Sequence, residues 1–563
     1  MALSLQVYAY GLFSLAVLSF FFFLVIKPLL TYLRDPLNLR KYPSPSPLTA
    51  LSSLWLVHAT WSQKRTRIIH AAHQRLGDVI RVSPNHLLFN DPAAIKDIYG
   101  VLAASQGVNK DEFYDRVAGD AHDLVQLRDR GEHGRRRKAL ANAFAAKTVV
   151  NMEAVIRNAL RELLVRIDKV VDEKSGDGDE IPVVNLRLWF NYFTLDVIGD
   201  MGFGVPMGFV RSLSDATVAE SQGGRTYAVA SLITSLHSGV RYGLSLGNLH
   251  SHALIQFAKR LVSFIPPLAA RLGSVGGSDF EDICIRKLRQ RIDQGPPTRS
   301  SGDFMGFILD DASPVENGKA TVQKGGGASE ISHATFRSLV ADSMMMMNAG
   351  SDTTASALTS TTWFLLQNPH ALDRLRRELA DAAAGNLAVD SAAAQQEDAI
   401  FPYETVKDLP FLRACIDETL RLRPPLAYAL PRLVSRPTTI AGHTVLPGTV
   451  VAVSPYSIHR HASLFRDPDA YRPERWVDFD AEFPQQREDL KKYNIVFSQG
   501  SRACIGRHLA IVELQILVAT FVMRYELELV GGSKAGLEIF DRFNSNPGPM
   551  FVGLRRRVGE VAQ

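Results

Sequence analysis

Hydrophobic residues form one long uninterrupted run near the start of the chain. This run, Leu5–Ile26, contains no charged residue, and as a helix it is about 33 Å long, close to the ~30 Å of a bilayer core. Four basic residues follow it: Lys27, Arg34, Arg40 and Lys41. The pattern predicts one membrane-spanning helix, with the remainder of the chain in the cytosol. A cleaved signal peptide is the alternative, but the run is too long for one and no small-x-small cleavage site follows.

Beyond this run, apolar residues recur mostly at helical spacing. Long helices are predicted over about 331–366 and directly after Cys504, whereas strand-like patterns occur at 79–89 and 438–453. The second strand-like stretch also contains the glycine and proline signals of hairpins. The chain is therefore expected to be mainly α with a small β region.

Prolines and loop-like stretches predict the domain organisation. Alternating prolines at 41–48, KYPSPSPL, favour a stiff and extended connection after the membrane helix. Four later stretches are typical of loops: 273–279, 295–303, 313–329 and about 383–398. Because they separate helical runs and not self-contained patterns, they are interpreted as insertions within one domain. We expect an anchor over 1–27, a juxtamembrane and proline-rich hinge over 28–50, and one large domain over 51–563.

Composition and charge narrow the function classes. The 563 residues are 46% hydrophobic and 21% charged, which is ordinary for a globular protein. A formal net charge of +5 is small for this length, and no basic stripe interleaved with aromatic residues occurs, so nucleic-acid binding is not expected. Three cysteines, Cys284, Cys415 and Cys504, lie far apart, which excludes a disulfide framework and indicates a reducing compartment.

Cys504 lies in a stretch with the spacing Phe-x-x-Gly-x-Arg-x-Cys-x-Gly. A buried structural thiol is the ordinary interpretation of a lone cysteine, but this spacing arises by chance on the order of once in ten million positions. The apolar residues that follow have helical spacing, so Cys504 precedes a helix whose dipole and free amides favour a thiolate.

The neighbours of the cysteine suit a site for a flat, anionic ligand. Gly500 allows the chain to turn, and Gly506 lets the following helix lie close to such a ligand because it has no Cβ. Phe497 can shield the sulfur from water, and the guanidinium of Arg502 suits a carboxylate.

This stretch resembles the haem-binding signature of the cytochrome P450 family. The resemblance implies the cytochrome P450 fold, preceded by the N-terminal transmembrane helix, and haem b with Cys504 as the axial ligand of its iron. Such a sulfur ligand pushes electron density toward the metal and favours O–O cleavage. The resemblance covers about residues 42–557 and includes further motifs in the order of the family.

One of these motifs lies within the helix predicted over 331–366. Met344–Met347 fit core packing, but Gly350, Asp352 and Thr353 place small and polar groups in an apolar helix, where a widened turn is expected. The alternative is a tolerated kink with the hydroxyls bonded to backbone carbonyls. The motif is similar to the family's Ala/Gly-Gly-x-Asp/Glu-Thr-Thr pattern. By this resemblance, Thr353 relays protons for oxygen cleavage and Asp352 supplies them.

Three charged residues indicate a structural ion network. Glu418 and Arg421 stand three apart on one face of a predicted helix, and Arg475 follows in a Pro-Glu-Arg element. An isolated pair of this kind is usually a solvated face. Together the three match the Glu-x-x-Arg and Pro-Glu-Arg elements of the family, which implies a buried network that stabilises the fold.

The resemblance also implies cations that bind the haem propionates. His133 and Arg137 lie four apart and match the family's Trp-x-x-x-Arg element, with His in place of Trp. Arg432 and Arg502 complete the set by resemblance. The basic run at 135–138 is otherwise typical of a solvated face, whose outward members suit docking of an acidic electron donor.

The family implies a monooxygenase in the endoplasmic reticulum membrane that takes electrons from NADPH-cytochrome P450 reductase and inserts one atom of O2 into a lipophilic substrate. Segments 112–117, 128–144 and 190–204 are similar to a filamentous-fungal branch that includes benzoate 4-hydroxylases and secondary-metabolite oxygenases. The implied pocket segments are the region after 112–117 together with 341–349, 426–430 and 543–550, and they are mostly apolar, with no obvious carboxylate-binding arginine. The expected substrate is a neutral polyketide, terpenoid or alkaloid intermediate.

Other functions are still compatible with these residues. They include benzoate 4-hydroxylase-like oxidation of a small aromatic acid, a haem-thiolate isomerase or dehydratase that needs no reductase, and a non-enzymatic haem carrier. The Asp352-Thr353 pair argues against the isomerase, because such enzymes often lack an intact acid-alcohol pair. Substrate-dependent oxidation of NADPH distinguishes a monooxygenase from an isomerase and from a haem carrier.

Overall fold

The computed structural model describes most of the chain after residue 21. It covers 22–557 with gaps at 120, 176–180, 250–251, 266, 268–271, 296–301, 313–314, 317–318, 321–331, 388–399 and 479–485. The anchor predicted over Leu5–Ile26 therefore lies outside the described residues, except for Phe22–Ile26 (η1). Within the described ranges, no helix combines the length and the hydropathy needed to cross a bilayer.

The described residues form a mostly helical body with small sheets, as the sequence predicts. The helices are α2 Lys27–Arg34, α3 Leu54–Trp61, α4 Arg65–Leu76, α5 Pro92–Tyr99, α6 Phe113–Val117, α7 Arg130–Ala141, α8 Ala146–Asn151, α9 Glu153–Ser175, α10 Leu186–Phe203, α11 Phe209–Ser212, α12 Leu232–Gly247, α13 His252–Ser263, α15 Ser274–Gln294, α16 Phe304–Ala312, α17 His333–Gln367, α18 Pro369–Leu387, α19 Tyr403–Val406, α20 Pro410–Leu422, α21 Pro455–Ile458, α22 Gln486–Tyr493, α23 Arg507–Arg524 and α24 Gly532–Ala535. Short 3-10 helices are η2 Pro47–Ala50, η4 Pro473–Trp476 and η5 Gly500–Arg502.

The strands form several small sheets. They are β1 Val79–Ser83, β2 His86–Phe89, β3 Val108–Lys110, β4 Val183–Asn185, β5 Thr217–Glu220, β6 Thr226–Val229, β7 Val315–Glu316, β8 Lys319–Ala320, β9 Arg432–Val434, β10 Thr438–Ile440, β11 His443–Val445, β12 Val450–Val453, β13 Tyr525–Leu529, β14 Ile539–Asp541, β15 Ser545–Pro547 and β16 Phe551–Arg556. The largest sheet has the order β1-β2-β12-β9-β3, and a second has the order β13-β16-β4. In the first sheet, β12 pairs parallel to β2, with Val450 opposite His86. Both strand-like stretches of the sequence therefore belong to this part of the fold or to the adjoining β10–β11 hairpin.

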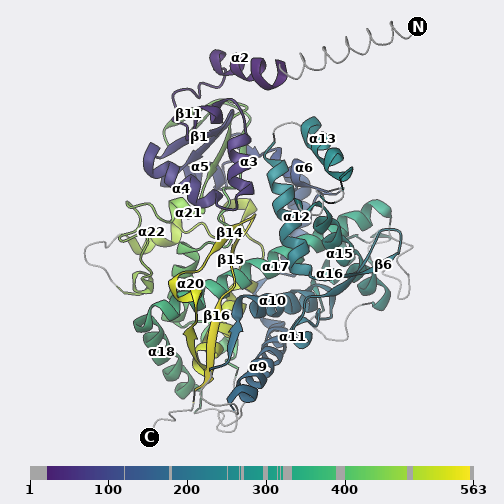
Figure 1. Cartoon of the computed structure of the whole chain (residues 1–563), viewed down its shortest axis with the longest axis vertical. Helices are drawn as coiled ribbons and strands as arrows, with labels where there is room; N and C mark the ends of the chain where they lie inside the picture. Colours follow the sequence, from purple (N-terminus) through teal and green to yellow (C-terminus); the bar gives the residue numbers. More distant parts are fainter. Residues whose placement is uncertain are drawn as a thin grey trace.

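The helix α17 runs through the middle of the body (Figure 1). It packs against α10, α20 and α23, and buried apolar residues of all four helices belong to one large core cluster. Figure 1 shows the end with β1 and β11 nearest to α2 and far from β16. The long helix predicted over about 331–366 is thus confirmed, and it is the central element of the core.

The segment before η2 packs onto the body. Leu39 and Tyr42 are 1% and 7% exposed, and both belong to the apolar cluster beneath the five-stranded sheet. The Arg81 N–H donates to the carbonyl of Pro43 across 2.9 Å. The prediction of an extended connection over 41–48 is wrong in part, because this stretch contains bends and ends in the 3-10 helix η2, Pro47–Ala50. The contacts of Leu39, Tyr42 and Pro43 fix the preceding segment to the domain.

Candidate active site

Backbone geometry fixes the loop that presents Cys504. The loop passes through η5 and continues into α23, which begins at Arg507, so the cysteine directly precedes a core helix as predicted. Its N–H donates to the carbonyl of Phe497 across 2.8 Å. Gly500 has a φ of +69°, and a Cβ there would lie 2.4 Å from the carbonyl oxygen of Tyr99. Only glycine fits both the left-handed turn and this close approach.

Cys504 has accessible surface within a crowded part of the protein. Of the three cysteines, Cys284 and Cys415 are buried, whereas Cys504 is exposed. Yet many protein atoms surround Cys504 at longer range, and this burial raises the pKa of its thiol. The Gly506 N–H and the Arg137 and Arg507 charges lower that pKa, but they offset burial only in part. A side chain with free surface inside a crowded region has room for a bound group, and a metal ion deprotonates a coordinating thiol outright.

A set of five cationic or protonatable side chains surrounds this region: Lys110, His133, Arg137, Arg432 and Arg502. Burial, with the charges of Arg502 and Lys110, lowers the pKa of His133 to about 3. Burial and repulsion from Arg432 lower the pKa of Arg502 to about 10 and that of Lys110 well below its usual value. These groups therefore destabilise one another's charged forms.

The contacts of this cationic set are mostly to neutral groups. Arg502 donates to the carbonyl oxygens of Leu127 and Arg128 across 2.7 and 3.1 Å, and Arg432 donates to the Tyr114 hydroxyl across 3.1 Å. Mutual repulsion between cations is relieved by an anion placed among them. The residues present thus fit a flat group that has carboxylates at its edge and binds a thiolate, as haem b does.

Asp352 on α17 is held by four donors from other elements. Its carboxylate accepts from Arg187 (3.1 Å), His237 (2.9 Å), Asn544 (2.8 Å) and Asn546 (2.6 Å). Burial alone would raise the pKa of Asp352, but His237 and Arg187 outweigh it and hold the pKa far below the usual range. In this arrangement Asp352 is a charged carboxylate with its acceptor positions filled.

Thr353 has a different environment from the acid beside it. It is only partly buried, whereas Asp352 and Thr354 are buried. Its hydroxyl donates to the carbonyl of Ala349 across 2.7 Å, the bond four residues back that the sequence alternative describes. The expected widened turn is wrong, because α17 is continuous α-helix from His333 to Gln367. The hydroxyls satisfy carbonyls without opening the helix.

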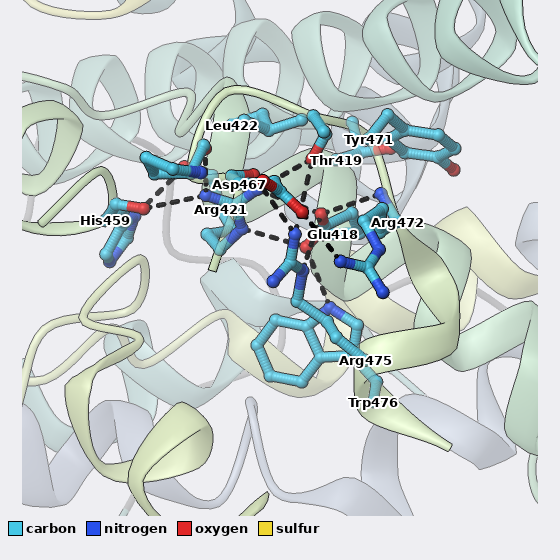
Figure 2. A network of polar contacts seen from close by, with 12 residues as sticks. Glu418, Thr419, Arg421, Leu422, His459, Asp467, Tyr471, Arg472, Arg475 and Trp476 are labelled. Carbon is cyan, nitrogen blue, oxygen red and sulfur yellow. Dashed lines mark hydrogen bonds and ion pairs between the residues drawn. The ribbon is translucent and has the colours of Figure 1, made fainter. Parts of the chain in front are cut away.

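The predicted ion network forms as a buried cluster around Glu418 (Figure 2). Arg421 binds both carboxylate oxygens of Glu418 across 2.8 and 2.9 Å, and Arg475 binds one across 3.0 Å. The Arg472 N–H and the Trp476 indole also donate to this carboxylate. The carboxylate is therefore fully compensated, and these donors hold the pKa of Glu418 below its usual value although burial raises it.

His459 joins this network to the Cys504 loop, and no sequence pattern predicted it. Its Nδ1 lies 3.2 Å from the carbonyl of Arg421, whose guanidinium donates to the His459 carbonyl across 2.8 Å (Figure 2). Its Nε2 accepts from the Ile495 N–H across 2.9 Å, two residues before Phe497. Burial and the Arg421 charge lower the pKa of His459 to about 3, so the ring is neutral.

Other site residues were also missed by the sequence reasoning. Lys110 belongs to the cationic set, while Arg187 and His237 hold Asp352. No motif marks them, and Arg187 and His237 lie more than 100 residues from Asp352 in the sequence. A charged residue within an otherwise apolar strand or helix was the only available signal.

Comparisons with known proteins agree with this geometry. The profile of the family described as cytochrome P450 matches residues 43–540. The chain is 28% identical to benzoate 4-monooxygenase bphA of Aspergillus niger, over 95% of this chain and 96% of that protein. It is 28% identical to cytochrome P450 monooxygenase ABA2 of Pyricularia oryzae (90% and 87%) and 30% identical to cytochrome P450 monooxygenase traB of Penicillium crustosum (81% and 80%). The matched range contains the whole Cys504 loop and the Glu418 network.

Proposed function

Since the chain belongs to the cytochrome P450 family and is therefore a haem-thiolate monooxygenase, we propose that it oxidises a lipophilic intermediate of fungal secondary metabolism, such as a polyketide, terpenoid or alkaloid. Monooxygenases of this family use O2 and electrons from NADPH through a reductase, which is NADPH-cytochrome P450 reductase in this proposal. The observation that carries the proposal is the accessible Cys504 thiol beside the cationic set. The two relatives named cytochrome P450 monooxygenase ABA2 and cytochrome P450 monooxygenase traB support the assignment to fungal monooxygenases.

In this proposal the Cys504 thiolate would bind the iron of haem b, and the cationic set would bind the propionates. Bound haem supplies the activation of O2 and the transfer of one oxygen atom to the substrate. The implied clamp is His133, Arg137, Arg432 and Arg502, to which the structure adds Lys110 as a neighbour. Phe497 would shield the sulfur, Gly500 allows the close approach of the loop to Tyr99, and Gly506 would leave room for the haem beside α23.

Thr353 and Asp352 are proposed to deliver protons. The Thr353 Oγ1 hydroxyl passes a proton toward the reacting oxygen and is then reprotonated, which requires it to release the Ala349 carbonyl. Asp352 remains ionised while its four donors are in place, so it passes on a proton only if His237 first takes one up at its other ring nitrogen and then donates from Nε2. Among those donors, His237 is the one that titrates near neutral pH when unperturbed, and its side chain is 16% exposed.

The same proposal places the catalytic domain on a membrane surface. Residues 1–27 would span the endoplasmic reticulum membrane, 28–50 would form the juxtamembrane segment, and 51–563 would lie on the cytosolic side. Exposed apolar side chains support it: Leu29, Leu30 and Leu33 on α2, and Leu254, Phe257 and Leu261 on α13. Figure 1 shows α2 and α13 toward the same end of the molecule. Carbonate extraction of membranes tests the anchor, and full-length protein in the supernatant would contradict it.

The decisive experiment is the spectrum of the reduced carbon-monoxide complex. Wild type should show the Soret band of a thiolate ligand, and Cys504→Ser should lose it while retaining much of the fold. With reductase and a turned-over substrate, NADPH oxidation should depend on that substrate. An isomerase or a haem carrier would consume no NADPH in this assay. Wild type without the thiolate band, or Cys504→Ser with it, would refute the assignment of the ligand.

A further inference from the structure

Arg65, the first residue of α4, is a buried cation without a polar partner. It is 3% exposed, and none of its three guanidinium nitrogens has a hydrogen-bond partner among the described residues. Its guanidinium lies over the ring of Tyr428, 3.6 Å from the centroid. A ring face accepts no conventional hydrogen bond, so the donors of this guanidinium are unsatisfied. Buried polar groups in native proteins are nearly always paired, so Arg65 requires an explanation.

The acidic residue whose charge acts on Arg65 already accepts hydrogen bonds from other groups. Asp541 attracts the Arg65 charge, but its carboxylate accepts from the Thr66 N–H across 2.9 Å and from the Ser545 hydroxyl across 2.7 Å. Arg65 and Asp541 form no ion pair within 4.0 Å. The part of the chain that the structure describes therefore provides no carboxylate that binds this guanidinium.

Two further arginines add positive charge to the same side of the molecule. Arg241 on α12 lies over Trp61, 3.9 Å from the ring centroid, and its Nε has no partner among the described residues. Arg542 donates to the side chain of Asn546, and burial lowers its pKa to about 10. Repulsion from Arg241 contributes to that shift, so the two cations are neighbours. The region has more positive charge than its acids compensate.

A continuous wall of aromatic side chains connects Arg65 to the haem-side cations. The Tyr428 ring that Arg65 covers is stacked on Phe113, with centroids 5.6 Å apart and planes at 22°. Phe113 contacts Tyr114 edge to face, and the Tyr114 hydroxyl accepts from Arg432. Phe543 also contacts Tyr428, 5.7 Å between centroids. Arg65 thus lies at the far end of a row of packed rings, of which Tyr428 and Phe543 belong to the segments expected to contact the substrate.

We propose that Arg65 binds the carboxylate of an acidic, otherwise apolar substrate whose oxidisable end extends along this aromatic wall toward Cys504. This inference rests on the proposed function and names the substrate class of the same site. A guanidinium binds a carboxylate with two parallel hydrogen bonds, which would satisfy the donors that the chain leaves free. The expectation of a neutral substrate arose because Arg65 lies outside the pocket segments that the sequence implied. Carboxylic acids among polyketides and terpenoids remain compatible with the general class.

The test compares acids with their methyl esters, because esterification removes the charge and changes little else. Benzoate, 4-phenylbutyrate and decanoate are titrated at pH 7.5, each beside its ester, into the haem-loaded enzyme, and binding is followed by the shift of the Soret band. At least one acid should bind wild type about 10- to 100-fold more tightly than its ester. Arg65→Met should remove this preference by weakening the acid and not the ester.

Arg67→Met is the matched control, since Arg67 is exposed on the same helix and its loss removes the same charge. It should leave the preference for the acid unchanged. A second measurement separates binding from packing: without ligand, Arg65→Met should unfold at a temperature no lower than wild type, because the buried charge has no partner to lose.

Several results would overturn the inference. They are esters that bind wild type as tightly as every acid, an equal loss of acid and ester binding in Arg65→Met, the same loss in Arg67→Met, or a lower unfolding temperature for Arg65→Met. The last result would assign Arg65 to the packing of Tyr428. Failure of the proposed function is distinguishable, because it appears as a missing thiolate Soret band in wild type before any ligand is added.

Discussion

The charges around Glu418 and the charge of Arg65 are buried to a similar degree but are compensated very differently. Arg421 donates two hydrogen bonds to the Glu418 carboxylate, and Arg475 and Trp476 donate one each to its oxygens. Arg65 has only the face of an aromatic ring. A buried charge that the chain compensates stabilises a particular fold, whereas an uncompensated one is a cost that a ligand can remove. The comparison separates structural charges from binding charges without reference to sequence motifs.

The largest expected effect concerns the partly buried hydroxyl of Thr353. Replacing Thr353 with Ala should lower product formation by about two to four decades, the range for losing positioned acid-base help. Iron reduction and oxygen binding need no such proton, so NADPH consumption should fall far less, and the difference should appear as hydrogen peroxide. Product, peroxide and NADPH are measured together for both proteins. Ser351→Ala is the control, because Ser351 is buried and donates to the Met347 carbonyl.

Equal coupling of NADPH to product in wild type and Thr353→Ala would remove Thr353 from the mechanism. Similar uncoupling in Ser351→Ala would indicate a general disturbance of α17 and not the loss of a proton relay.

Glu418 gives the sharpest test of the compensated region. Glu418→Gln should lower the free energy of unfolding by about 3–5 kcal/mol, because it leaves the buried cations of Arg421 and Arg475 without their counter-charge. Urea unfolding followed by circular dichroism measures the change. Glu132→Gln breaks an exposed pair with Arg135 and should cost less than about 1 kcal/mol. If both variants lose the same small amount, the network is not a structural element.

Truncation tests whether the packed part of the N-terminal segment belongs to the domain. Deleting residues 1–26 should leave the stability of the domain unchanged. Deleting residues 1–42 removes Leu39 and Tyr42 from the cluster beneath the five-stranded sheet, and it should cost about 3–4 kcal/mol by lost apolar burial. Thermal unfolding of the two truncated proteins gives the comparison. Equal stabilities would show that this segment is a free linker.

Acid should weaken the compensated region through His459. Its folded pKa of about 3 lies below the value near 6.5 of the unfolded chain, so the unfolded state binds the proton first. The stability is complete above pH 6.5 and is lost as the pH falls toward 3, by about 3 kcal/mol between pH 6.5 and 4. His459→Gln should unfold with a flatter pH dependence than wild type. Parallel pH profiles for the two proteins would contradict this role.

The sequence predicted the local parts of this site better than the partnerships between distant elements. The helix α17, the turn at Gly500 and the Glu418–Arg421 pair follow from short-range patterns, and the structure contains all three. Asp352 and Thr353 were predicted in the same way, and their role in proton delivery is still a prediction. The donors of Asp352 could not be found, because tertiary packing brings them from α10, α12 and the turn between β14 and β15. The unpaired state of Arg65 is likewise a property of its three-dimensional surroundings alone.

The parallel pairing of β2 with β12 also has a consequence for how the protein is made. Val450 pairs with His86, so the partner strand of β2 is translated about 360 residues after β2 itself. At ordinary elongation rates this edge of β2 therefore stays unpaired for roughly 20–70 seconds during synthesis. An unpaired strand edge is a template for association with other chains. Production of this enzyme should therefore depend on chaperone capacity and translation speed, and cells that elongate more quickly should protect more of the nascent chain from aggregation.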